Sequence, residues 1–264
     1  MTRVAIIAAM PAELKPLVRG WEHERRNGVD LWRWRFDEGE WIAACAGAGW
    51  QAATRAFAEV EKDGLIDRVI SVGWAGALSE SLVRGRAYAV SGVIDMQTGE
   101  RFEVRDFPVL EREVGMQTHP SDKNKDVARV GHPGLWLVTS PRVADADEKR
   151  RLAKTYDAGL VDMEAAALAR LASMRGIPFE CVKGVSDGFV DDLIDFNRFI
   201  SQDGQFKTAR LLLFVLPRPW HWPGLVRMGE NSRKASQAIR DLLLENLDEP
   251  GVIANQNGDS NLTR

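Results

Sequence analysis

Short runs of apolar and β-branched residues recur along the first 190 residues and predict the strands of a largely buried sheet. Eight such runs lie at 4–8, 31–36, 41–46, 68–72, 86–95, 135–139, 159–163 and 179–185. Between several of them, apolar residues recur at helical spacing, which predicts helices at 12–19, 51–63, 147–155 and 164–175. Strands that alternate with helices indicate a mostly parallel sheet with helices on both faces. We therefore expect an α/β fold.

The alternation breaks in two places. Residues 96–134 are polar and irregular and contain three prolines, and long loops of this kind are often functional or mobile. Residues 200–247 combine an apolar run, a Pro- and Trp-rich stretch and a helical pattern rich in Arg and Lys. The polar tail 248–264 predicts disorder. We expect one domain over 1–247, of which 200–247 is a divergent helical part.

Composition and charge narrow the class of protein. The 264 residues carry a formal net charge of −3 with no evident basic face, which gives nucleic-acid binding little support. Cys45 and Cys181 lie in apolar runs and are expected to be buried thiols of a reducing compartment. The four histidines form no cluster in the sequence, so no metal site is predicted. The N-terminal apolar run is too short for a signal peptide and no segment reaches the ~20 apolar residues of a membrane span, so we expect a cytoplasmic protein.

Two carboxylates stand out from this framework. Glu164 and Asp187 each lie near the end of a predicted strand, and one predicted helix joins them. Ligands of open α/β sheets bind beyond the strand ends. A carboxylate buried there is costly unless it is paired or used. The two residues are therefore candidates for a functional site.

Four motifs, in this order, resemble the purine nucleoside phosphorylase and nucleosidase superfamily. They are Ala9-Met10 followed by Glu13, the loop 73–78 (Gly-Trp-Ala-Gly-Ala-Leu), the stretch 161–167 (Val-Asp-Met-Glu-Ala-Ala-Ala) and a strand that ends in Ser186-Asp187. Their order and spacing are most similar to the branch of 5′-methylthioadenosine/S-adenosylhomocysteine nucleosidases. The resemblance implies a single-domain, three-layer α/β/α fold with a central mixed sheet, a homo-oligomer such as a dimer, and no cofactor.

The resemblance also implies roles around the scissile bond. Cleavage of an N-glycosidic bond passes through an oxocarbenium-like sugar, and the leaving purine is normally protonated at N7. Asp187, held by the hydroxyl of Ser186, is the expected acid. Met163 is expected to pack on the sugar or base, and Glu164 to accept hydrogen bonds from the ribose hydroxyls. The simpler interpretations are a loop cap for Asp187 and a first-turn residue stabilised by the helix dipole for Glu164.

Glu13 matches the base that activates water in the nucleosidase branch, although a Glu in the first turn of a helix is expected anyway. Phosphorylases of the superfamily instead tend to carry Gly and Arg near this point, to hold phosphate. After Met10 no Arg occurs before Arg19. This difference favours water over phosphate as the nucleophile, and phosphate would be a co-substrate only in the phosphorolytic alternative.

The chain departs from the branch at two positions. Trp74 stands where the branch has a Ser that helps to place the water, and it either reshapes the pocket or packs in the core. Lys183 stands where the branch has an Arg. Lysine keeps the positive charge but loses the bidentate fork, and we expect Lys183 to support the nucleophile electrostatically.

The remaining candidate contacts are made by small residues and by the backbone. Ala75 and Gly76 follow Trp74 in the loop and are expected to contact substrate. Val143 and Ala144 align with the segment through which the family binds adenine by backbone groups. Residues 46–49 (Ala-Gly-Ala-Gly) are interpreted as a tight turn with close backbone packing, because their spacing is not that of a dinucleotide-binding loop.

The tract 211–228 is the least similar to the family. One interpretation is a buried C-terminal helix with a Pro- and Trp-rich turn. The alternative is an apolar and basic surface that meets a membrane or a lipid-like substrate. This ending resembles the hopanoid-associated phosphorylase-like proteins, which release adenine from an adenosyl-lipid.

The function that we predict is hydrolysis of the N-glycosidic bond of a purine nucleoside, a 5′-modified adenosine, with release of adenine. The partner is therefore a small-molecule nucleoside. Phosphorolysis on the same scaffold, including that of an adenosyl-lipid, is the first alternative. A non-catalytic nucleoside-binding protein is the second, and Trp74 and Lys183 are the sequence features that favour it.

Overall fold

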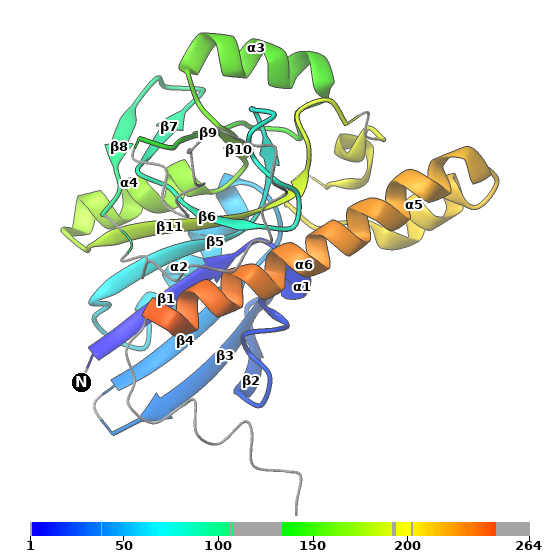
Figure 1. Ribbon diagram of the computed structural model, residues 1–264. Helices are drawn as coiled ribbons and strands as arrows, with labels where there is room; N and C mark the ends of the chain where they lie inside the picture. Colours follow the sequence, from blue (N-terminus) through cyan, green and yellow to red (C-terminus); the bar gives the residue numbers. More distant parts are fainter. Residues whose placement is uncertain are drawn as a thin grey trace, which may run out of the picture.

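The structure is a computed structural model that describes residues 2–37, 39–105, 107, 134–191, 194–201 and 203–246. Figure 1 shows a central sheet with helices in front of it and behind it. The tail for which disorder is expected, and most of the irregular segment 96–134, lie outside the described residues.

Within the described residues, eleven strands form one sheet. They are β1 (Thr2–Ala8), β2 (Glu22–Arg26), β3 (Val29–Phe36), β4 (Gly39–Cys45), β5 (Arg68–Ala77), β6 (Ala87–Ala89), β7 (Gly92–Asp95), β8 (Arg101–Glu103), β9 (Trp136–Thr139), β10 (Leu160–Asp162) and β11 (Phe179–Asp187). The main order is β2-β3-β4-β1-β5-β10-β9-β7-β8, and β11 pairs with β5 and β6. The central neighbours β4, β1, β5 and β11 run parallel, whereas β2, β3, β6, β8 and the β5–β10 pair add antiparallel contacts. The predicted mixed central sheet is confirmed.

The helices cover both faces of the sheet. They are α1 (Pro11–Leu14), α2 (Trp50–Glu61), α3 (Ala146–Tyr156), α4 (Ala165–Arg175), α5 (Thr208–Val215) and α6 (Trp222–Asn246), with 3-10 turns η1 (Phe196–Phe199) and η2 (Pro219–His221). Helices α2 and α4 pack on one face, and α1 and α6 pack on the other. Along β1, Ala5 and Ile7 join the first core while Val4 and Ile6 join the second. Burial on both faces explains why the strand is apolar from Val4 to Ala8, and the three-layer arrangement is confirmed.

Helix α1 is shorter than the pattern predicts. The sequence favours a helix over 12–19, but α1 ends at Leu14. Pro16 lacks the backbone N–H that would continue the hydrogen-bond ladder, and its ring crowds the carbonyl one turn earlier, so the regular α-helix stops before it, although Lys15 still has helical dihedral angles. Glu13 lies in the first turn of α1, close to the end of β1.

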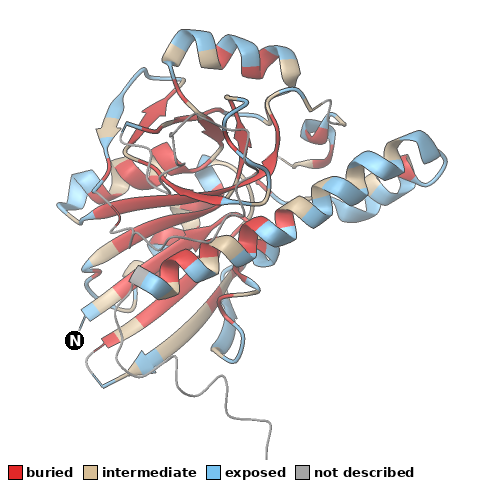
Figure 2. Cartoon of the chain, viewed as in Figure 1, coloured by how far each residue is buried: buried red, intermediate tan, exposed pale blue. Residues whose placement is uncertain are grey.

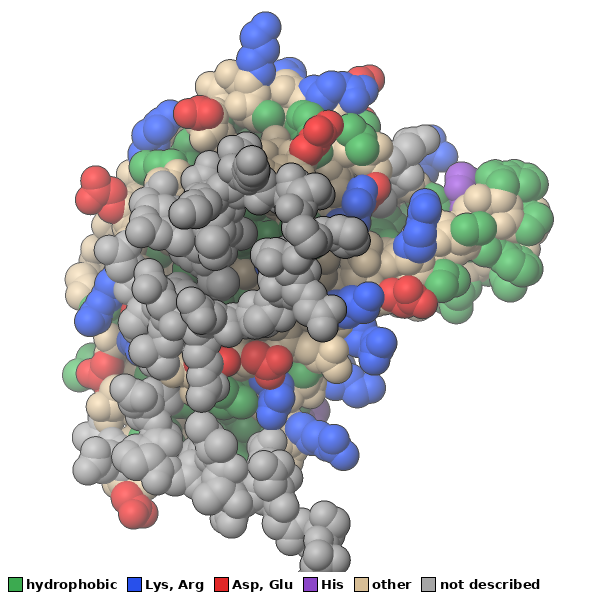
Figure 3. Space-filling view, viewed as in Figure 1, with side chains coloured by type: hydrophobic (Ala, Val, Ile, Leu, Met, Phe, Trp, Pro, Cys, Tyr) green, Lys and Arg blue, Asp and Glu red, His purple; other side chains and the backbone are tan. Residues whose placement is uncertain are grey.

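Helix α5 differs from the interpretation of the tract 211–228 as a buried C-terminal helix with a Pro- and Trp-rich turn. It buries only Val215, and the chain then turns through η2 into α6. Figure 2 shows this part as largely exposed, and Figure 3 shows hydrophobic side chains gathered at its far end. None of the helices in the described ranges combines the length and the apolar character needed to cross a membrane.

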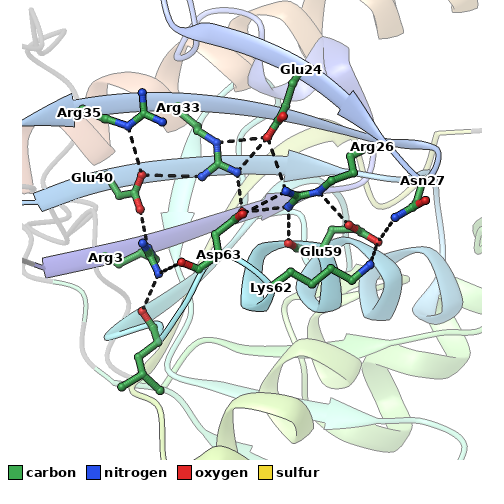
Figure 4. A network of polar contacts seen from close by, with 11 residues as sticks. Arg3, Glu24, Arg26, Asn27, Arg33, Arg35, Glu40, Glu59, Lys62 and Asp63 are labelled. Atoms are coloured by element: carbon green, nitrogen blue, oxygen red, sulfur yellow. Dashed lines mark hydrogen bonds and ion pairs between the residues drawn. The ribbon is translucent and has the colours of Figure 1, made fainter.

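Strand β2 has no apolar alternation and was missed by the sequence pattern. It lies at one edge of the sheet, and its charges join a network with the end of α2 (Figure 4). Arg26 pairs with Glu59 at 3.0 Å and with Asp63 at 2.9 Å, and Arg33 also reaches Asp63. The hydrogen bonds from Arg26 lower the pKa of Asp63 to about 2. Charged side chains on an edge strand oppose pairing with another sheet, so we assign this network a structural role.

Strands β5 and β11 extend further than the apolar runs that predicted them. They pair in parallel from Phe179 opposite Val69 to Asp187 opposite Gly76, with a register shift after Val185. Their carboxyl ends therefore meet at one edge of the sheet, where ligands of α/β folds bind. A Cβ atom on Gly76 would lie 3.0 Å from Asp187 Oδ2, so glycine leaves room for that carboxylate.

Candidate active site

A cavity of about 340 Å³ opens at the carboxyl ends of β1, β5, β10 and β11. All but one of the predicted site residues line it: Glu13, Trp74, Ala75, Gly76, Val143, Ala144, Met163, Glu164, Ser186 and Asp187. The exception is Lys183, which lies beneath the cavity floor in the middle of β11. Residues far apart in the sequence thus come together because the parallel strands β1, β5 and β11 end at one edge of the sheet, and the short strand β10 pairs with the last residues of β5.

The Glu13 carboxylate is fixed by backbone N–H groups. Its Oε2 accepts hydrogen bonds from Ala9 at 2.8 Å and Met10 at 2.9 Å, and its Oε1 accepts one from Trp74 at 2.9 Å. Burial raises the pKa of Glu13, although these hydrogen bonds act in the opposite direction. A Cβ atom on Gly73 would come within 2.9 Å of Oε1, so the loop needs glycine there. The result is an immobilised carboxylate facing the cavity with a raised proton affinity.

Glu164 lies at the N-terminal end of α4, where the chain leaves β10. Its Oε1 accepts a 2.6 Å hydrogen bond from the backbone N–H of Gly49. The loop 46–49, interpreted from sequence as a tight turn, therefore also positions this carboxylate. Burial, followed by repulsion from Asp162, raises the pKa of Glu164 to about 8. The raised pKa makes the ionised form of this carboxylate a strong hydrogen-bond acceptor.

Asp187 accepts hydrogen bonds from two side chains. Ser186 Oγ donates to its Oδ1 at 2.6 Å, as the sequence resemblance predicts. The ammonium group of Lys149, on α3, forms an ion pair with Oδ2 and also donates to the Gly188 carbonyl at 2.7 Å. Lys149 is only 1% exposed, so this pair is screened from solvent.

Lys183 is buried in a second ion pair. Its Nζ lies 2.9 Å from Asp162 Oδ2 and donates to the Val72 carbonyl at 3.2 Å. Burial alone would lower the pKa of Lys183, but the Asp162 carboxylate raises it above the usual value. Its positive charge opposes the rise in pKa that burial causes at both Glu13 and Glu164. Lys183 therefore acts on the cavity by electrostatics from below rather than by contact.

The Trp74 side chain links the cavity wall to α6. Its indole Nε1–H donates to Ser236 Oγ at 2.9 Å, while its backbone N–H holds Glu13. Ser236 is buried and also donates to the Ser232 carbonyl one turn earlier. Both sequence interpretations of Trp74 are partly met, because the residue lines the cavity and its ring tip is engaged in helix packing.

Val143 lines the cavity, and its backbone groups already have a partner. Its N–H donates to Asn197 Oδ1 at 2.8 Å, and Asn197 Nδ2 donates to its carbonyl at 3.0 Å. A carboxamide presents the same donor and acceptor pair as the N6 and N1 edge of adenine. A base that used the Val143 backbone would therefore have to displace Asn197.

The family description that matches this sequence is that of the phosphorylase superfamily, over residues 3–215. The chain belongs to the phosphorylase superfamily. This membership confirms the predicted superfamily and the prediction of an enzyme that acts on nucleosides.

Two relatives place the chain near one branch of the superfamily. A 5′-methylthioadenosine/S-adenosylhomocysteine nucleosidase of Shewanella piezotolerans is 24% identical over 233 residues, which cover 81% of this chain and 98% of that protein. The nucleosidase of the same name from Treponema pallidum is 34% identical over 79 residues, which are 29% of each chain. The predicted similarity to this branch is confirmed.

Solved structures share the fold. A Helicobacter pylori nucleosidase mutant with 5′-methylthioadenosine in its active site gives a TM-score of 0.65 at 14% identity, covering 94% of this chain and 99% of that one. The futalosine hydrolase of Helicobacter pylori gives 0.64 at 14% identity, over 94% and 97% of the two chains. The Arabidopsis thaliana 5′-methylthioadenosine nucleosidase gives 0.65 at 17% identity, over 94% and 95%.

Sequence reasoning missed several residues of this superfamily site. Lys149 was hidden in a predicted helix that is charged at most positions, and Asp162 was passed over beside the more familiar Met163-Glu164 pair. Asn197 lies in η1, a short 3-10 turn whose sequence matches no motif. In the parts of the chain that the structure describes, no group of three or more His, Cys, Asp or Glu side chains could hold a metal ion.

Proposed function

We propose that this phosphorylase-superfamily enzyme hydrolyses the N-glycosidic bond of a 5′-modified adenosine and releases adenine. The observation that carries the proposal is the Glu13 carboxylate, held by three backbone N–H groups at the cavity wall. The names of the relatives support the substrate class, because they are nucleosidases of 5′-methylthioadenosine and S-adenosylhomocysteine.

The base leaves with help from Asp187. Both carboxylate oxygens accept hydrogen bonds from side chains, so a proton for purine N7 must reach Asp187 from a neighbour. Lys149 Nζ is in contact with Oδ2 and can pass a proton to it as Asp187 passes one to N7. Lys149 then becomes a neutral amine while the ribosyl group gains positive charge, so the buried site keeps its net charge during bond cleavage.

The sugar is held by Glu164 and Met163. A carboxylate that accepts hydrogen bonds from the ribose hydroxyls also stabilises positive charge developing on the sugar. Its raised pKa means that it is a strong acceptor once it is ionised. Met163 lies beside it on the same wall and offers an apolar surface to the sugar or base.

The nucleophile is a water molecule activated by Glu13. Glu13 Oε1 accepts only the hydrogen bond from Trp74, so it keeps a lone pair for the water molecule, whereas Oε2 uses both of its lone pairs on Ala9 and Met10. A raised pKa makes the carboxylate a better proton acceptor at neutral pH. The proton of the attacking water passes to Glu13 as its oxygen bonds to the sugar C1′, so the products are adenine and a free 5′-substituted ribose.

Phosphorolysis is the second candidate, because one observation favours it. Arg142 lines the cavity, and its guanidinium is largely exposed. The Arg142 guanidinium could hold a phosphate there.

The apolar side chains of Phe196, Phe206 and Met228 also line the cavity and suit an apolar 5′ group, including that of an adenosyl-lipid.

Base release from a panel of adenosine derivatives, with and without phosphate, tests the proposal. The panel contains adenosine, 5′-methylthioadenosine and an adenosine with a long 5′-alkyl chain, and chromatography separates the products. Adenine with free sugar in the absence of phosphate is the expected result. Adenine with ribosyl 1-phosphate, and only when phosphate is present, would establish phosphorolysis instead. Nucleoside binding without base release would identify a non-catalytic binding protein.

A further inference from the structure

We infer that the segment 207–229 docks on an anionic lipid surface. This segment, called the projection below, comprises Lys207, α5, η2 and the first two turns of α6. In Figure 1 it extends away from the sheet on the right of the view. The rest of the protein covers little of it, as the pale blue colour for exposed residues shows in Figure 2.

The projection exposes large apolar side chains. Leu213 is 73% exposed, Trp220 is 69% exposed and Leu216 is 62% exposed. Leu212, Trp222 and Val226 are also exposed, so the described part of the chain has most of its exposed large hydrophobic residues here. Others, such as Leu65 and Met174, lie scattered in separate elements. Contiguous exposed apolar surface of this kind marks an interaction site.

The charged side chains within the projection itself are all Lys or Arg. Between Asp203 and Glu230 the sequence contains four basic residues and no acidic one, although the whole chain has a net charge of −3. The basic residues are Lys207, Arg210, Arg218 and Arg227. Arg218 stacks over Phe214 at 4.1 Å and donates to its carbonyl, which fixes one of these charges at the turn.

Lipid is the occupant that this chemistry fits best. A bilayer surface accepts leucine side chains into its acyl region, tryptophans at the boundary, and Lys or Arg beside anionic headgroups. A second copy of the chain would bring the same four positive charges against themselves around a two-fold axis, and like charges repel. The apolar surface and the charge therefore favour a lipid surface over self-association.

The body holds the projection in place. Ala235, Ile239 and Leu243 of the same continuous helix are buried against the core, and α6 packs along β11. The bond from Trp74 to Ser236 adds a polar tie next to the cavity. Trp222 is thus carried on a supported helix, and its indole Nε1–H donates to the Val215 carbonyl at 3.0 Å, which ties α5 with its exposed leucines to α6.

The projection also borders the site. A second hollow, of about 640 Å³, is lined by Ser186 and Asp187 of the site and also by Trp220, Pro223 and Leu225 of the projection. Phe196 and Met228 line both this hollow and the active-site cavity. Docking through Trp220 would bring this hollow to the lipid surface. This last step rests on the proposed function, whereas the docking itself does not.

Vesicle flotation with the full chain tests the inference. One vesicle contains equal parts phosphatidylcholine and phosphatidylglycerol, and the other contains phosphatidylcholine alone. We expect the protein to float with the anionic vesicles, and the bound fraction to fall as salt is added. The double variant Leu213→Ser/Leu216→Ser should bind at least about tenfold more weakly, and Lys207→Gln/Arg210→Gln should lose the preference for anionic lipid.

The matched control is Leu65→Ser/Met174→Ser, which removes two exposed apolar side chains elsewhere and should float like the unchanged protein. No flotation with either vesicle, or equal loss in the control, would overturn the inference. Concentration-dependent self-association in sedimentation, abolished by the leucine variant without any vesicle binding, would assign the projection to a second copy. Adenine release from a soluble nucleoside, measured on the same samples, reports on the proposed function separately.

Discussion

Each carboxylate oxygen of Asp187 contacts a side chain, Ser186 at Oδ1 and Lys149 at Oδ2, and these contacts determine what a substitution of Asp187 should do. Asp187→Asn keeps the size of the side chain and a hydrogen bond from Ser186, but it cannot pass a proton to N7. We expect turnover to fall by about 10²–10⁴-fold, with nucleoside affinity nearly unchanged. Adenine release and calorimetric binding measure the two effects. Asp157→Asn is the control, since Asp157 is exposed and has φ of 52°, a conformation that Asn tolerates.

Lys149 is predicted to act through Asp187, as a positioning and proton-supplying residue. Lys149→Met should lower kcat by about 10–100-fold, and the kcat–pH profile should change shape because the proton donor is lost. It should also reduce stability by about 3–5 kcal/mol, since Asp187 would be left as a buried charge without a cation. Lys149→Arg keeps the charge and should recover part of kcat. Lys154→Met, at an exposed position of α3, is the control and should match the unchanged enzyme. If Lys149→Met left the kcat–pH profile unaltered, the proton-supplying role would be excluded.

The raised pKa of Glu164 makes a prediction about activity. If the ribose hydroxyls need its carboxylate, kcat/KM should rise with pH through a limb near 8, the pKa of the free enzyme. Glu164→Gln should lower kcat/KM and remove that limb. A limb that persists in Glu164→Gln would assign the titration to another group, of which Glu13 is the first candidate.

The raised pKa of Glu164 also predicts how the stability of the protein depends on pH. The folded state holds the Glu164 proton more tightly than the unfolded state, whose pKa is near the ordinary 4.5. The free energy of unfolding should therefore fall as pH rises from 4.5 to about 8, by the linkage between proton binding and folding. Denaturant unfolding at intervals across this range, compared with Glu164→Gln, isolates the contribution, because Glu13 acts in the same direction in both proteins.

The sequence identified the residues whose chemistry depends on local position. Glu13, Glu164 and Asp187 all stand where a strand gives way to a helix or loop, and such positions are visible in the alternation of the chain. Lys149 was not identified, because its neighbours Glu148, Arg150 and Arg151 are equally charged. Only the contact with Asp187, which is 38 residues away, distinguishes it, and a hydropathy pattern holds no information about that distance.

At the scale of elements, the hydrogen bond from Trp74 on β5 to Ser236 on α6 positions a side chain of the cavity wall. Ser236→Ala would leave the Trp74 indole N–H without its partner, at a cost of about 1–3 kcal/mol. Because Trp74 also lines the cavity, we expect KM to rise a few-fold while kcat changes little. Steady-state kinetics and thermal unfolding measure both. Ser232→Ala, one turn earlier on α6, is the control: its hydroxyl does not contact Trp74, so an equal rise of KM there would contradict a specific role for the tie.

The elements that the sequence predicted well are those with one dominant periodicity. The central strands contain long apolar runs because α2 and α4 cover one face and α1 and α6 the other. Strand β2 was missed because its charges are balanced by the end of α2 rather than by solvent alone (Figure 4). The run at 211–216 was apolar enough to suggest burial, but no neighbouring element in the described chain covers α5 beyond Val215. Tertiary partners, which no local pattern contains, decide such cases.

At the scale of the whole molecule, α6 connects the buried core to the exposed projection, and Gly184 on β11 is where it lies closest to the sheet. A Cβ atom there would approach Ala235 Cβ to 2.7 Å, and Ala235 is fully buried. Gly184→Ala should therefore cost about 1–3 kcal/mol by overpacking and lower Tm by several degrees. Gly229→Ala is the matched control, because a Cβ at Gly229 meets nothing within 4 Å and lies in the helix interior. It should raise stability by about 0.5–1 kcal/mol; calorimetric Tm values that moved in the same direction for both variants would show that close packing at Gly184 does not anchor α6.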